Sequence, residues 1–255
     1  VDAPSIEVLC TPAEVQPVGG LARFEAEEQW SRQVASRIGD PSGAVILQEL
    51  DRSDSSGKEP EIAARLAFYA HLLRETRDSL AEAITRVDAA LDAGIRTAPL
   101  LAIRGALANS SSIFEFTDTD AELDRAEAFA REALALDGDN AHAHLVLSWP
   151  TLVRGHTQLA IGHIETAVRL APYQPFYLIA AGIALSACGE WERGSQLIRE
   201  AHQLNPGMSA LTHAWLAMGH VVEGDYGRAL AEASLLPSED DFGWGSLMRV
   251  LALAG

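Results

Sequence analysis

Residues 140–172 read NAHAHLVLSWPTLVRGHTQLAIGHIETAVRLAP, and residues 174–206 read QPFYLIAAGIALSACGEWERGSQLIREAHQLNP. The two stretches repeat at a period of about 34 residues when Pro172 is aligned on Pro206. The positions that then agree in residue type are Gly155 with Gly189, Ala160 with Gly194, Ile164 with Ile198, Ala167 with Ala201, and Leu170 with Leu204. Agreement at several positions in one register indicates an internal repeat and predicts a stack of similar units.

Each unit has the pattern of two helices. In the first unit, residues 141–153 place apolar side chains such as Leu145 and Leu152 at helical spacings. Gly155 permits the left-handed turn that ends this helix. A second helix is predicted for residues 158–170, where Ala160 and Ala167 are small enough to let the paired helices approach closely. One such pair cannot bury its apolar face alone, so neighbouring pairs must stack.

This spacing resembles the tetratricopeptide repeat (TPR), a unit of two helices and about 34 residues. The resemblance covers residues 61–255 and implies an all-α, right-handed superhelical solenoid of about five helix pairs plus a terminal helix. We expect an insertion of about nine residues around 109–119, between the two helices of the second pair. The predicted helices are 61–75 and 79–93, 98–108 and 120–136, the two repeats quoted above, a pair within 210–236, and a last helix within 241–254.

The first 60 residues do not follow the repeat. Residues 6–10 and 44–47 are short apolar runs, and residues 21–38 have the pattern of an amphipathic helix between them. We therefore predict a small α/β segment at 1–50, a polar linker at 51–60, and the solenoid at 61–255. The chain begins at Val1 without a methionine, which suggests a fragment or a processed protein.

A degenerate first repeat followed by a lengthened second one also resembles the TPR regions of bacterial multidomain regulators. In such proteins the repeats accompany a nucleotide-cyclase or DNA-binding output domain. This resemblance is one of layout, without a diagnostic motif. It implies a signalling or regulatory role in which the solenoid positions an output domain outside this chain.

The composition limits the partners. Acidic residues outnumber basic ones 36 to 19, which gives a net charge of −17 and a surface that repels nucleic acids and anionic membranes. No secretory signal and no long apolar run is present. Cys10 and Cys188 do not form a disulfide framework, so we predict a reducing, cytoplasmic environment.

Candidate sites for metals and catalysis have simpler explanations. His142 and His144 lie two residues apart, so on a helix they point in different directions and do not chelate one ion. The acidic residues at 118–124 lack the glycine of a calcium loop and are explained by the start of a helix. No catalytic or phosphate-binding motif occurs. We expect no cofactor, no metal and no enzymatic activity within this chain.

Pro150 lies inside a predicted helix and cannot donate a hydrogen bond to the Val146 carbonyl. One interpretation is a tolerated kink. The other is a bent groove beside Trp149, in which the free carbonyl accepts a hydrogen bond from a ligand.

The TPR resemblance also implies which residues of the first helix in each pair face the concave surface. The lining is mostly apolar, and only Arg65 and nearby Asn109 are of the types that clamp a terminal carboxylate, so a chaperone-tail clamp is not expected. The groove residues are Arg65, Phe68, Leu72, His142, Leu145, Trp149, Leu152, Phe176, Ile179, Ile183, Leu211, Met218 and Val221.

We therefore predict a scaffold that binds a protein or peptide segment in an apolar concave groove. A first alternative is structural: the groove holds the chain's own N-terminal segment or a twin subunit, and the solenoid controls an output domain. A second alternative is an enzyme whose active site lies in a part outside this sequence.

Overall fold

A computed structural model describes residues 59–114, 119–205, 212–236 and 244–254. Every regular element within these ranges is a helix, which confirms the predicted all-α class. The α/β segment predicted at 1–50 lies outside the described residues. No helix in the described ranges combines the length and the apolar character needed to span a membrane.

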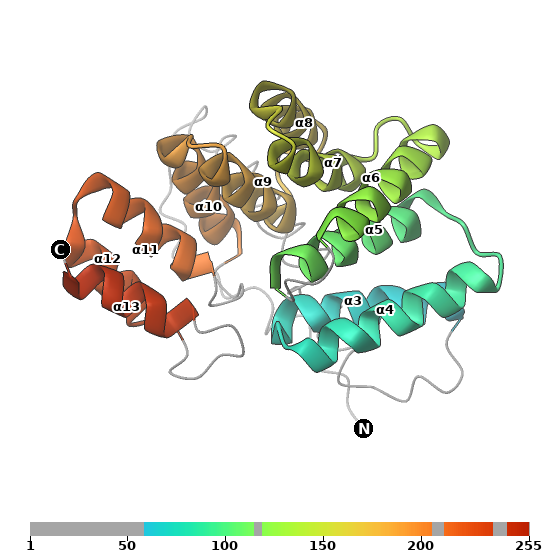
Figure 1. The fold of residues 1–255 in the computed structure, drawn as a ribbon, viewed down its shortest axis with the longest axis horizontal. Helices are drawn as coiled ribbons and strands as arrows, with labels where there is room; N and C mark the ends of the chain where they lie inside the picture. Colours follow the sequence, from blue (N-terminus) through green and yellow to red (C-terminus); the bar gives the residue numbers. More distant parts are fainter. Residues whose placement is uncertain (1–58, 115–118, 206–211, 237–243, 255) are drawn as a thin grey trace, which may run out of the picture.

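The helices follow one another as antiparallel pairs (Figure 1). The first helix of each pair also contacts the first helix of the pair before and after it, so the pairs stack in a curved row from α3 to α13 (Figure 1). This arrangement confirms the predicted solenoid. The pairs are α3 (Pro60–Arg74) with α4 (Arg77–Asp92), α5 (Ala98–Phe114) with α6 (Thr119–Leu136), α7 (Ala141–Val153) with α8 (Thr157–Leu170), α9 (Pro175–Ala187) with α10 (Trp191–Leu204), and α11 (Thr212–Glu223) with α12 (Tyr226–Ala233), followed by α13 (Trp244–Ala254).

The turns within the pairs depend on glycine where the sequence predicts it. Gly155, Gly189 and Gly224 follow α7, α9 and α11 with φ angles of 83°, 89° and 77°. These angles lie in the left-handed region, which glycine enters without a Cβ clash. The repeated glycine therefore fixes the point at which each chain reversal occurs.

Small residues set the spacing within a pair, as predicted. Gly182 of α9 faces Gly194 of α10 so closely that a Cβ built on Gly182 would lie 2.7 Å from the Gly194 carbonyl oxygen. Ala160 and Ala167 of α8 are fully buried at the corresponding interface with α7. The two helix backbones touch at these small residues, so no larger side chain fits between them there. The larger core residues lie before and after this contact.

The second pair differs from the prediction. The expected insertion at 109–119 is partly helical, because α5 continues to Phe114. The serines that suggested a loop are buried and bond back to their own helix: Ser111 Oγ donates to the Leu107 carbonyl at 3.1 Å, and Ser112 Oγ donates to the Asn109 carbonyl at 2.8 Å. The helix thus satisfies its polar side chains internally, and the prediction of its end at residue 108 is wrong.

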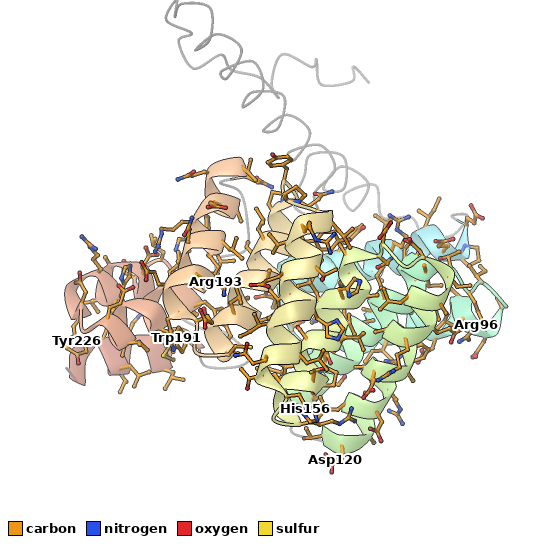
Figure 2. The ribbon with its side chains drawn as sticks, turned by 90° about the horizontal axis from the view of Figure 1, so that it is seen from above. Arg96, Asp120, His156, Trp191, Arg193 and Tyr226 are labelled. Carbon is orange, nitrogen blue, oxygen red and sulfur yellow. The ribbon has the colours of Figure 1, made fainter. Side chains whose placement is uncertain are left out.

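Ion pairs on the outer surface join neighbouring units. Arg193 of α10, labelled in Figure 2, donates to Glu165 of α8 at 2.7 Å, across the boundary between two pairs. Arg154, after α7, pairs with Asp124 and Glu127 of α6. Arg193 and Glu165 are about half exposed, so their ion pair contributes on the order of 0–1 kcal/mol and helps alignment more than stability.

Candidate binding cavity

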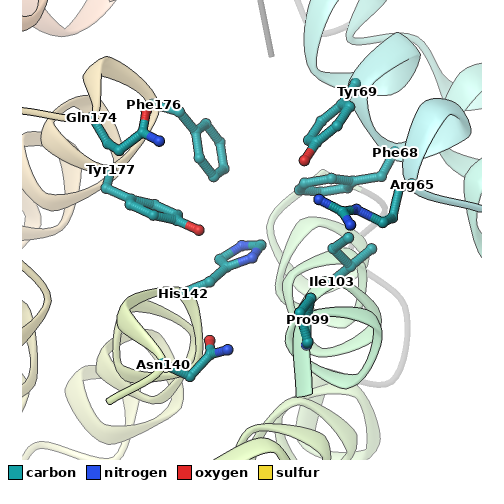
Figure 3. A pocket seen from close by; sticks show the side chains of 10 residues that line it. All are labelled: Arg65, Phe68, Tyr69, Pro99, Ile103, Asn140, His142, Gln174, Phe176 and Tyr177. Atoms are coloured by element: carbon teal, nitrogen blue, oxygen red, sulfur yellow. The ribbon is translucent and has the colours of Figure 1, made fainter. Parts of the chain in front are cut away.

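A cavity of about 220 Å³ lies between α3, α5, α7 and α9, on the side of the first helix of each pair (Figure 3). Residues from four consecutive pairs therefore meet at one place. The residues that line it, within the part of the chain that the structure describes, are Arg65, Phe68 and Tyr69 from α3, Pro99 and Ile103 from α5, Asn140 and His142 from the start of α7, and Gln174, Phe176 and Tyr177 from the start of α9.

The lining residues are positioned by the way in which these helices begin. The Asn140 Oδ1 accepts a hydrogen bond from the Ala143 backbone N–H at 3.0 Å and caps α7. Pro175 occupies the first turn of α9, where a missing N–H costs little, and places Phe176 directly after it. Three of the four helices thus turn their N-terminal ends toward the cavity, and α3 contributes from its middle.

Aromatic rings form much of the wall. Phe68 and Phe176 meet edge to face, with ring centroids 6.1 Å apart and planes at 84°. His142 lies between them, with centroids 5.6 Å from Phe68 and 5.5 Å from Phe176. Such ring pairs hold one another in place, and here they join the first helix pair to the fourth.

Arg65 is the one residue of the described lining that is charged at neutral pH. Tyr69 accepts a hydrogen bond from its guanidinium and raises the pKa of Arg65, and the nearby Glu61 acts in the same direction. Burial lowers the pKa of His142 to about 4, so its imidazole is neutral at pH 7. Burial also raises the pKa of Tyr177 to about 12, so its hydroxyl remains protonated.

The structure brings some of the predicted groove residues to this cavity and places others elsewhere. Arg65, Phe68, His142 and Phe176 line it. The Trp149 indole donates to Ser112 Oγ at 3.3 Å, on α5. Leu152 and Val221 are half-buried on α7 and α11, and Leu211 lies outside the described residues. The remaining predicted residues belong to or pack against the core clusters between helices: Leu72, Leu145, Ile179, Ile183 and Met218.

Sequence reasoning missed the other part of the lining. Pro99 is the second residue of α5, as His142 and Phe176 are the second residues of α7 and α9, so extending the same register to the second pair would have found it. Asn140 and Gln174 are also equivalent, since they are 34 residues apart and directly precede α7 and α9. No repeat position signals the rest, Tyr69, Ile103 and Tyr177, because their places depend on helix packing.

The carbonyl freed by Pro150 is not available to a ligand. The Val146 carbonyl oxygen accepts a hydrogen bond from the Asn109 side-chain Nδ2 at 2.9 Å, and both residues are buried. The helix α7 continues past Pro150 to Val153. The interpretation as a ligand-binding carbonyl is therefore wrong, and the same bond uses the Asn109 Nδ2.

Several of the other histidines and acids have local partners. His144 and His163 approach each other, with their Nδ1 atoms 3.3 Å apart. Within the described residues, no group of three or more His, Cys, Asp or Glu side chains is arranged to hold a metal ion. Asp120 and Glu122 lie in the first turn of α6, where acidic side chains stabilise a helix N-terminus.

No protein-family model matches the sequence, and no curated protein matches it. Solved structures resemble the fold. A thermophilic TPR protein from Thermus thermophilus, TTC0263, is 16% identical over 76% of this chain and all of its own, with a TM-score of 0.57. A monomeric mutant of IFIT1 with m7Gppp-AAAA is 15% identical over 92% of this chain and 48% of its own, with a TM-score of 0.55. The chain therefore has a TPR-like fold, and at these identities the likeness concerns the fold alone.

Proposed function

We propose that this TPR-like solenoid binds a segment of a partner protein along the concave side of its odd-numbered helices, and that it does so without catalysing a reaction. The observation that supports this proposal is the cavity, where ten described residues from four helices converge. The predicted groove residues that are half-buried and outside the core clusters, Trp149 and Leu152 of α7 and Val221 of α11, extend this surface in the proposal. The partner segment is an amphipathic helix or an extended peptide.

The character of the cavity supports binding. Ligand sites are typically concave and mainly apolar, with a few polar groups that fix orientation. Here the cavity is concave but more polar than such sites: four of its ten described lining residues are apolar, and the other six, among them Arg65 and Gln174, carry polar groups. At about 220 Å³ the cavity is smaller than the roughly 300–1,000 Å³ of sites for larger ligands. It therefore suits one anchoring side chain of a partner.

A random peptide library displayed on phage tests the proposal. Peptides selected on the wild-type protein should lose most of their affinity for Phe176→Glu, because the charge would enter an apolar wall of the site. The control is Leu159→Glu on α8, where the wild-type side chain is 57% exposed and outside the cavity. Fluorescence anisotropy of labelled peptides measures the affinities.

Thermal melts establish that both variants are folded before binding is compared. Equal affinity for the two variants contradicts the proposed surface. A melting temperature much lower in Phe176→Glu than in Leu159→Glu would identify Phe176 as ordinary core. Leu152→Glu on α7, where the wild-type side chain is half-buried, then serves as the second test of the groove.

A second candidate function, self-association that positions an output domain, is favoured by one observation on α13. Leu247, Val250 and Leu253 lie three residues apart and are 47%, 62% and 71% exposed, so they form an apolar stripe on this helix. If a second copy covers the stripe, light scattering should show a dimer that Val250→Lys converts to a monomer. A monomeric wild-type chain rules out this contact.

A further inference from the structure

We propose that the cavity between α3, α5, α7 and α9 selects a planar ring that carries one carboxylate. This inference rests on the proposed function and specifies the chemical group that enters the site. It follows from the volume of the cavity, from the sign of its charge and from the placement of its polar groups.

The volume admits one ring with a small substituent. An apolar protein cavity of about 150 Å³ holds benzene. The present cavity, at about 220 Å³, leaves room for a ring and an additional group of the size of a carboxylate. The half-buried rings of Phe176 and Tyr177 present surfaces against which another ring can pack edge to face or offset, and the buried Phe68 ring supports Phe176 from behind.

The charge of the lining residues indicates whether the ring in this cavity carries a positive or a negative group. A cage of aromatic rings by itself attracts a cation through the faces of the rings. Here the Arg65 guanidinium lines the cavity, so a cationic ligand would meet a like charge. No acidic side chain occurs in the described lining. Glu61, one turn before Arg65, lies outside the lining, accepts a hydrogen bond from Thr97 Oγ1 at 2.8 Å, and stabilises the positive charge of Arg65. The local charge therefore favours an anion, although the chain as a whole has a net charge of −17.

The polar groups are placed to hold a carboxylate at the edge of the ring. Figure 3 shows the Arg65 guanidinium and the Tyr177 hydroxyl pointing into the space from opposite walls, with the Gln174 amide above them. A guanidinium and a carboxylate form paired, charge-assisted hydrogen bonds. The Asn140 amide is already used, since it caps α7 and its Nδ2 donates to Asp137 Oδ2 at 3.4 Å. The starts of α5, α7 and α9 add the positive ends of three helix dipoles.

Three probes of similar size test the charge preference. They are phenylacetate, which is anionic, benzyl alcohol, which is neutral, and benzylamine, which is cationic. Titration calorimetry with the full chain should show phenylacetate binding about two- to fivefold more tightly than benzyl alcohol, with benzylamine the weakest. Arg65→Gln should weaken phenylacetate by about two- to fivefold and leave benzyl alcohol unchanged.

The matched control is Arg74→Gln, which removes a charge from the same helix outside the cavity and should leave all three affinities unchanged. Arg65 is exposed, so its replacement is compatible with folding, and a thermal melt verifies this. The proposal is overturned if benzylamine binds as tightly as phenylacetate, if Arg65→Gln has no effect on phenylacetate, or if no probe binds at millimolar concentration.

Peptides distinguish the two sources of such a group. A peptide that ends in phenylalanine with a free carboxylate, and the same peptide with a C-terminal amide, are compared with phenylacetate. Preference for the free acid peptide identifies a partner's chain end, and binding of phenylacetate alone identifies a free aromatic acid. If phage-selected peptides bind regardless of charge, the scaffold proposal stands and this inference fails. If the aromatic acids bind but no peptide is selected, this inference stands and the scaffold proposal fails.

Discussion

Gly182 should be a position where adding one methyl group destabilises the protein, although the same change normally favours a helix. A Cβ at Gly182 would lie 2.7 Å from the Gly194 carbonyl oxygen, 2.7 Å from Ile198 Cγ1 and 3.3 Å from the Ile198 backbone nitrogen. The first two distances are shorter than any that real Cβ atoms make, and one of them is to backbone. Helices α9 and α10 must therefore move apart for the side chain to enter.

The magnitude follows from two opposing terms. Overpacking of this kind costs roughly 1–3 kcal/mol. Replacing glycine by alanine in a helix contributes up to about 1 kcal/mol in the favourable direction. Gly182→Ala should therefore lower the free energy of unfolding by about 1–2 kcal/mol, which corresponds to roughly 2–8 °C in melting temperature for a chain of this length.

Gly162 supplies the matched control. It lies in α8, and a Cβ built there has no heavy atom within 4 Å. Gly162→Ala should stabilise the protein by about 0.5–1 kcal/mol. Urea denaturation followed by far-ultraviolet circular dichroism measures both variants. If the two substitutions change stability in the same direction by similar amounts, the close approach of α9 and α10 is not real and the packing argument is refuted.

Three further predictions concern stability. Asn109→Leu should lower the free energy of unfolding by roughly 1–3 kcal/mol, because it leaves the buried Val146 carbonyl without its hydrogen-bond donor. Pro150→Ala, added to the same variant, should recover much of that loss in denaturation experiments, because it restores a backbone N–H that can donate to this carbonyl. The free energy of unfolding should fall as the pH drops from 6.5 toward 4, because burial lowers the pKa of both His71 and His142 to about 4 and these histidines are protonated first in the unfolded chain. The loss is on the order of 3 kcal/mol per histidine. His142→Gln should reduce the loss, as measured by denaturation at several pH values. Chelators should leave the melting temperature unchanged, because the described residues contain no cluster suited to a metal; a chelator-dependent loss of several degrees would contradict this.

The helix ends could be predicted because local chemistry decides them. Gly155 and Gly189 end their helices by adopting positive φ angles, and Pro175 starts α9, as the sequence indicates. The end of α5 could not be predicted in this way. The Asn-Ser run at 109–112 has the composition of a turn, and only burial and hydrogen bonds back to the helix keep it helical.

The candidate site was predictable only in part, for a physical reason. The repeat register indicates which face of a single helix a residue occupies, and it placed His142 and Phe176 at the cavity. It does not indicate how far successive helices rotate relative to each other. Tyr69 and Tyr177 come from α3 and α9, two helices that are not consecutive in the stack, so their convergence depends on the curvature of the solenoid.

The same curvature bears on how a ligand would act. In a solenoid each unit contacts mainly its neighbours, so coupling between distant units is weak. The Phe68–Phe176 contact already crosses from the first pair to the fourth, through His142 of the third. A group bound among these rings would touch all four pairs at once, and its binding free energy would favour the curved form over straighter ones. A site assembled by curvature is therefore also a site that can regulate curvature, since any ligand that binds the curved form preferentially must stabilise it.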